Sequence, residues 1–85
     1  MRLAPVVPNP VRGVAAIAFD LPRASKVSLA AYDVAGRHVA TLASGSWKAG
    51  HHSVSWTPGA RLASGVYLLR LAGPGRTESR RLLRL

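Results

Sequence analysis

The chain contains no cysteine, so disulfide bonds, thiol nucleophiles and cysteine-based metal sites are all excluded. It also lacks any apolar run near the roughly 18 residues that a membrane-spanning helix needs. A secretory signal peptide is not expected at the start, because Pro5, Pro8 and Pro10 interrupt any apolar segment there. With 85 residues there is material for one hydrophobic core, and we expect a single domain over residues 1–85.

Acidic residues are almost as scarce as cysteine. The only three are Asp20, Asp33 and Glu78, and none has an acidic neighbour in the sequence, so a pair of catalytic carboxylates has little to build on. No serine lies in the G-x-S-x-G pattern of a nucleophile elbow. The segment Gly73–Gly75 holds a proline where a phosphate-binding loop needs a free backbone N–H. The sequence therefore predicts a protein that is not an enzyme and uses no cofactor.

The histidines do not indicate a metal site. His51 and His52 are adjacent, so in a strand their side chains point to opposite faces and cannot easily share an ion. His38 is distant from both in the sequence. We expect these side chains to be hydrogen-bonded within the domain or to face solvent.

Aromatic residues are few, and those that could form a stacking platform for sugars or nucleobases are Tyr32, Trp47 and Trp56. Trp56 shares a strand face with Val54 and is expected to fill the core. Trp47 falls in a predicted loop over residues 44–50 and is the better candidate for exposure, although one ring makes a weak platform. No RNA-recognition pattern is present, and we expect no nucleic-acid partner.

Basic residues dominate the charge and give a formal net charge of +9. Most are arginines dispersed along the predicted strands and turns, which we interpret as a compositional bias. Only Arg80, Arg81 and Arg84 cluster. The alternative interpretation is a surface that binds a polyanion such as an anionic glycan or a lipid headgroup.

Apolar and small or polar residues alternate along most of the chain, as in strands that are buried on one face. Residues 1–8 are expected to form an extended lead, with a short edge strand over residues 3–7. Val39 and Leu42 break strict alternation and predict a bulge or an early strand end. Turn signals recur at short intervals and no spacing favours a helix. The sequence predicts an all-β, Ig-like antiparallel sandwich of about seven strands, which lie over residues 3–7, 13–21, 26–33, 37–43, 51–56, 62–72 and 76–85.

The stretch Leu62–Ala72 is the predicted central strand. Alternation places Tyr67, Leu69 and Leu71 on one face, which then needs a second sheet to cover it. Val66, Leu68 and Arg70 fall on the other face. The segment Gly65–Leu69 has the spacing of a tyrosine corner, in which a tyrosine near the start of an Ig-type strand bonds back to the preceding loop. Tyr67 lies two residues before the core position, which here is Leu69.

The clearest turn is Asp33–Gly36. An aspartate at the first position can bond to the turn backbone, and a glycine at the fourth can take a left-handed conformation. We predict a type I turn with a glycine bulge that closes a hairpin.

These motifs occur in an order that resembles a known family. Over residues 9–85 the chain looks like the C-terminal sorting domain of bacterial proteins secreted by the type IX system (the Por secretion tail). It is similar as well to the related Ig-like module of the flagellar hook-capping protein. The resemblance rests on a basic and apolar last strand and on a series of motif residues, for which it implies structural roles: Asn9, Pro10, Asp33, Gly36, Trp56, Gly65 and Tyr67.

The resemblance implies an Ig-like domain appended to the C-terminus of a secreted enzyme or adhesin, on the surface of a Gram-negative bacterium or released from it. In the sorting family the domain passes through the periplasm and is recognised by translocon and sortase proteins of the outer membrane. It is often cleaved as the cargo is attached to anionic lipopolysaccharide. The terminal strand is thought to carry much of the signal, and by position it matches Arg80, Arg81, Leu82, Leu83, Arg84 and Leu85.

The chain departs from the usual sorting pattern in two places. Arginine stands where lysine is common near the end, and Thr57–Arg61 replaces an acidic, Asn-rich turn. Two other functions therefore stay open beside sorting. One is a structural spacer or assembly domain, as in hook capping, and the other is an accessory module that binds an anionic glycan or surface polymer.

Overall fold

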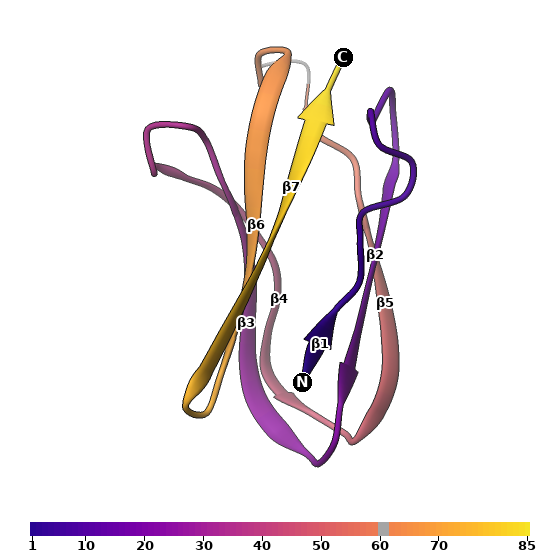
Figure 1. Cartoon of the computed structure of the whole chain (residues 1–85), viewed down its shortest axis with the longest axis vertical. Helices are drawn as coiled ribbons and strands as arrows, with labels where there is room; N and C mark the ends of the chain where they lie inside the picture. Colours follow the sequence, from indigo (N-terminus) through magenta and orange to yellow (C-terminus); the bar gives the residue numbers. More distant parts are fainter. Residues whose placement is uncertain (60–61) are drawn as a thin grey trace.

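The computed structural model describes residues 1–59 and 62–85, and these form seven strands in two antiparallel sheets (Figure 1). One sheet has the order β1-β2-β5 and the other the order β4-β3-β6-β7. The predicted all-β, Ig-like sandwich is confirmed. Part of the predicted turn over Thr57–Arg61 falls on residues 60 and 61, which lie outside the described residues. The strand bounds are β1 Arg2–Leu3, β2 Ala15–Leu21, β3 Ser25–Tyr32, β4 His38–Trp47, β5 Gly50–Trp56, β6 Gly65–Gly73 and β7 Arg76–Arg84.

The core lies between the two sheets and is built by alternation along each strand. In β6, Tyr67, Leu69 and Leu71 are buried and their neighbours face outward. Strands β2 and β3 contribute alternate residues in the same way, among them the fully buried Phe19 and Leu29. Burying a large apolar side chain of this kind contributes about 1.5–3 kcal/mol to the stability of the folded state. The central position predicted for β6 is also confirmed, since β6 lies between β3 and β7.

Strand β4 is longer than the sequence predicts. It continues to Trp47, so the loop expected over residues 44–50 is wrong. Trp47 is half-buried: its ring meets Phe19 edge-on at 5.5 Å between centroids, and its Nε1 donates to the Ser44 carbonyl at 3.1 Å. The polar and glycine residues before Trp47 look like a turn in the sequence, but they pair with β3, where Gly45 lies opposite Val27 and Trp47 opposite Ser25. The irregular pairing expected in this strand is present as register shifts between β3 and β4.

The turn between β3 and β4 has the predicted conformation. The Gly36 N–H donates to the Asp33 carbonyl at 3.0 Å, and Gly36 has a φ of +83°, which a residue with a side chain rarely adopts. The Asp33 carboxylate Oδ1 accepts from the backbone N–H groups of Ala35 and Arg37 at 3.0 and 2.9 Å. Local hydrogen bonds therefore hold this turn.

The N-terminal segment passes from one sheet to the other and covers the free edge of β7. Strand β1 pairs with β2, but farther on Val11 donates to the Leu83 carbonyl at 2.7 Å and accepts from Leu85 N–H at 2.9 Å. The Asn9 side chain donates to the Arg81 carbonyl at 3.2 Å and accepts from Leu83 N–H at 3.0 Å, as a paired backbone would. Asn9 precedes Pro10 through a cis peptide bond. These contacts satisfy edge groups that would otherwise invite pairing with another chain.

Tyr67 links β6 to the loop before it. Its hydroxyl donates to the Ala63 carbonyl at 2.6 Å, the bond that defines a tyrosine corner. Its ring also meets that of Trp56 edge-on at 6.3 Å between centroids, and Trp56 is buried. Gly65, two residues earlier, has a φ of +145°, which lets the chain turn sharply into the strand.

We predict that Tyr67→Phe lowers the free energy of unfolding by about 1–2 kcal/mol, because the partly buried Ala63 carbonyl loses its partner. Chemical denaturation of the purified domain measures this. Tyr32→Phe is the matched control, since no hydrogen bond from the Tyr32 hydroxyl is seen within the described part of the chain. Equal stability of the Tyr67→Phe variant and the unmodified domain would contradict the prediction.

Candidate functional site

The outer face of the four-stranded sheet carries a group of exposed apolar and basic side chains at its tyrosine-corner end. Val66, Leu68 and Leu83 are 39%, 36% and 38% exposed and lie next to one another on this face. A half-buried tyrosine and two exposed arginines adjoin them. We call this set the outer-face patch: Tyr32, Val66, Leu68, Arg70, Arg81 and Leu83.

Strand register brings these residues together. Burial of Tyr67 and Leu69 turns the side chains between and beside them outward, because successive residues of a strand point to opposite faces. Tyr32 on β3 lies opposite Leu68 on β6, and Leu68 lies opposite Arg81 on β7. Val66 and Leu83 are paired in the next row. A hollow on this face is lined by Tyr32, Val66, Leu68, Arg70 and Arg81, among others.

Arg70 is held above the patch by an aromatic ring. Its guanidinium carbon lies 5.3 Å from the centroid of Tyr32, within the range of a cation–π interaction. His38 meets the same ring edge-on at 5.7 Å between centroids. The contact with Tyr32 restricts the arginine without neutralising it, so its charge stays available at the surface.

The carboxylates of the chain are all engaged with other groups, including Asp33, which also lines the hollow on this face. Asp33 pairs with Arg37 at 2.9 Å, Glu78 with Arg76 at 2.8 Å, and Asp20 contacts His51 at 2.7 Å. Since the sequence has only these three acids, neither Arg70 nor Arg81 has a carboxylate partner in the described residues. The outer-face patch is therefore apolar at its centre and positively charged beside it.

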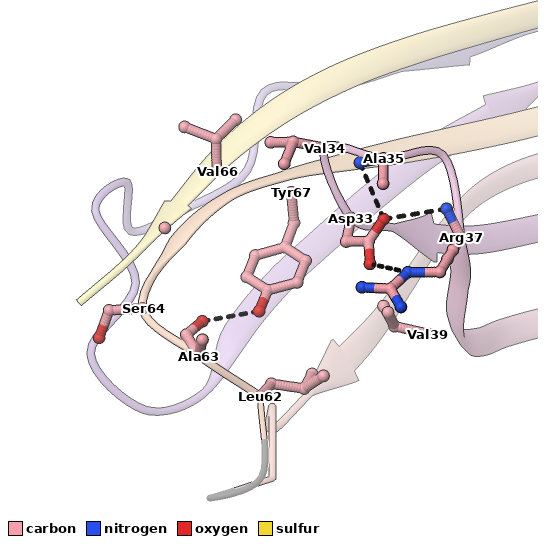
Figure 2. Close-up of a pocket in the computed structure, with 11 residues that line it drawn as sticks. Asp33, Val34, Ala35, Arg37, Val39, Leu62, Ala63, Ser64, Val66 and Tyr67 are labelled. Carbon is pink, nitrogen blue, oxygen red and sulfur yellow. Dashed lines mark hydrogen bonds and ion pairs between the residues drawn. The ribbon is translucent and has the colours of Figure 1, made fainter.

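A second hollow adjoins the patch at the end of the sandwich, between the β3–β4 turn and the segment before β6 (Figure 2). Val39 and Leu62 give it apolar walls, and it shares Val66 with the patch. Two of its polar side chains already have partners: Tyr67 bonds to Ala63, and Asp33 bonds to the turn backbone and to Arg37. These two groups serve the fold, and Ser64 is a further polar residue in the lining.

The six terminal residues that the resemblance marks as a sorting signal divide between two environments. Leu82 is fully buried in the core opposite Tyr67. Arg80 Nε donates to the Leu3 carbonyl at 2.9 Å, and Arg84 donates to the carbonyls of Leu62 and Pro58. The other three residues point outward: Arg81, Leu83 and Leu85 are exposed, and the first two belong to the outer-face patch.

The adjacent histidines lie on opposite sides of β5. His51 bonds to Asp20, whereas His52 contacts the Lys48 carbonyl at 2.6 Å and packs against Phe19 and Trp47. No group of three potential metal-ligating side chains is found among residues 1–59 and 62–85. In the same part of the chain no helix is long and apolar enough to cross a membrane.

The fold defines the chain as an Ig-like β-sandwich module, with a tyrosine corner at the start of its sixth strand. Residues 9–75 match the family model of the FlgD Ig-like domain, and the chain belongs to this family. Of the two families that the sequence resembles, this is the flagellar one. The match ends before β7, so the predicted sorting residues lie outside it. No curated protein and no solved structure matches the chain significantly.

Sequence reasoning did not identify the outer-face patch as a site. Alternation alone placed Val66, Leu68 and Arg70 together on the face opposite the core. The pairing of β7 with β6 and of β6 with β3 was needed to add Arg81, Leu83 and Tyr32. Exposed large aliphatic residues on two neighbouring strands, β6 and β7, were the missing signal.

The structure predicts acid sensitivity through two carboxylates. The Leu3 backbone N–H, with help from Arg76, lowers the pKa of Glu78, and the Arg37 backbone N–H lowers the pKa of Asp33. A carboxyl with a lowered pKa in the folded state stabilises the fold above its unfolded pKa, and this stability is lost as the pH falls through the folded pKa. We expect the domain to lose stability below about pH 4.5, where ordinary carboxyls begin to protonate.

Glu78→Gln tests this prediction, because the amide keeps the shape and cannot ionise. Denaturation at a series of pH values from 7 to 3 should show a shallower loss of stability for the variant than for the unmodified domain. The two proteins should converge at the acid end. Parallel pH profiles would show that Glu78 contributes nothing to the acid sensitivity.

Proposed function

We propose that the chain is a non-catalytic Ig-like assembly module that makes protein–protein contacts on behalf of a larger protein. The observation that carries this proposal is the cluster of exposed aliphatic residues on the outer-face patch, where Val66, Leu68 and Leu83 adjoin one another across β6 and β7. Exposed apolar clusters of this kind mark interaction surfaces. Membership of the FlgD Ig-like family agrees with a structural role of this type.

The absence of catalytic activity is part of the same proposal. Each acid that might act as a proton donor or acceptor is instead bonded to a neighbour: Asp33 to a turn, Glu78 to the Leu3 backbone and Arg76, and Asp20 to His51. General acid–base chemistry needs a group that can reach the substrate. Asp33 lines the hollow on the outer face, but its carboxylate is bonded to the turn backbone and to Arg37.

Site-specific photo-crosslinking tests the assembly function in cells that produce the protein. A photoreactive amino acid at Leu68 should yield covalent adducts with another protein, because Leu68 lies at the centre of the outer-face patch. The matched control is the same amino acid at Ser53, an exposed position on the outer face of the three-stranded sheet. Absence of protein adducts from Leu68, or equal adducts from both positions, would overturn the proposal.

Type IX sorting is a second proposal, and a specific feature supports it. The terminal strand displays Arg81, Leu83 and Leu85 at the surface, where a receptor could contact them. Deletion of residues 80–85 would not test this function. It would remove Leu82 from the core and the Leu83 and Leu85 bonds to Val11, so a loss of secretion could equally reflect loss of the fold.

Surface substitutions on β7 avoid that difficulty. The domain, fused behind a signal peptide and a fluorescent reporter, is produced in a bacterium with a type IX system. Sorting predicts that the reporter reaches the cell surface or the medium, and that Arg81→Ser with Leu83→Ser reduces this several-fold. Thr77→Ala with Ser79→Ala is the control on the same face of the strand. A folded domain retained in the periplasm would exclude sorting and leave the assembly function.

A further inference from the structure

We infer that the outer-face patch binds an acidic polypeptide segment in which carboxylate and aliphatic side chains lie next to each other. This inference rests on the proposed function of protein–protein contact and adds the chemistry of the partner. It combines two independent properties of the patch, an aliphatic centre and arginines without carboxylate partners.

The aliphatic centre favours a protein partner over a polysaccharide. Val66 and Leu83 form a cross-strand pair, and Leu68 lies one row away on the same face. Branched aliphatic side chains bury well against other aliphatic side chains, whereas sugar rings stack preferentially on aromatic ones. The single aromatic residue of the patch, Tyr32, is half-buried, and the Arg70 guanidinium lies over its ring.

The two arginines determine the charge of the partner. Arg81 lies directly opposite Leu68 across β6 and β7, and Arg70 follows Leu68 on the same face of β6. Both are exposed, and all three acids of the chain are bonded elsewhere. Arginine pairs with carboxylates through a planar fork of donors. The contact with Tyr32 orients Arg70 in advance, which reduces the entropy lost when a carboxylate binds.

Other surfaces of the domain do not combine these properties. The outer face of the three-stranded sheet presents small residues such as Ala16, Ser53 and Ser55. At the far end of the four-stranded sheet, the register aligns Ser28 with Ala72 and Ala72 with Thr77. Arg23, in the β2–β3 turn, has no exposed large aliphatic residue among its neighbours in the sequence. The docking site is therefore local, although the net charge is spread over the whole domain.

A titration of the ¹⁵N-labelled domain, followed by NMR, tests the inference. The probe is a short peptide in which glutamate alternates with leucine, and the matched peptide has glutamine in place of glutamate. We expect chemical-shift changes centred on Val66, Leu68, Arg81 and Leu83 with the glutamate peptide, and much weaker changes with the glutamine peptide. Binding should weaken as salt is added, because the ion pairs are exposed.

Variants separate the two properties of the patch. Arg70→Gln with Arg81→Gln should weaken binding of the glutamate peptide about three- to twentyfold, the range expected for two exposed ion pairs. Leu68→Ser should weaken it by a similar factor through the lost aliphatic contact. Arg23→Gln, which removes one positive charge outside the patch, should leave the affinity unchanged. Circular dichroism and thermal unfolding establish that each variant is folded.

Heparin and vesicles containing anionic lipid serve as polyanion probes. If they bind as strongly as the glutamate peptide and their affinity does not change with Leu68→Ser, the domain recognises negative charge alone and the inference is wrong. No binding of the glutamate peptide at the patch would overturn it as well. If crosslinking at Leu68 still yields protein adducts in that case, the assembly function stands and only the acidic character of the partner is refuted. Absence of adducts would refute the assembly function itself.

Discussion

The structure depends on the burial of one face of β6. This strand lies between β3 and β7, and its buried face packs against the opposite sheet. Tyr67, Leu69 and Leu71 must leave water together, and a strand can bury them only by turning the intervening residues outward. The same constraint that builds the core therefore places Val66, Leu68 and Arg70 on the outer face. The candidate site therefore lies on the face of the sheet opposite to the residues that stabilise the fold.

The chain has only three acidic residues, and this scarcity affects both the stability of the fold and the charge of its surface. Each of the three carboxylates bonds to a group within the domain, and two of them hold the backbone: Asp33 closes the β3–β4 turn, and Glu78 accepts from the Leu3 N–H at the edge of the sandwich. Because no acid is left over, the arginines of the outer-face patch have no carboxylate partner among the described residues. A strongly basic composition becomes a specific surface only where such arginines adjoin exposed aliphatic residues.

Strand β7 contributes both to the hydrophobic core and to the outer-face patch. Its inward residues bind the core and the chain before β2: Leu82 fills the interior, and Arg80 donates to the Leu3 carbonyl. Its outward residues, Arg81 and Leu83, complete the outer-face patch. A partner that contacts the end of the chain would thus meet side chains from β3 and β6 as well. These two residues are therefore part of a folded surface.

The amino-acid sequence by itself determined the fold class, the faces of β2, β3 and β6, and the Asp33–Gly36 turn, because alternation and turn chemistry are local properties. It misplaced Trp47, since residues 44–46 resemble a loop until the ring is seen packed on Phe19 across the sandwich. Only the tertiary structure decided the register of β7, the crossing of Asn9 and Val11 to its edge, and the assembly of the outer-face patch from three strands. These features depend on contacts between residues far apart in the chain, and alternation within a strand carries no information about which strand lies beside it.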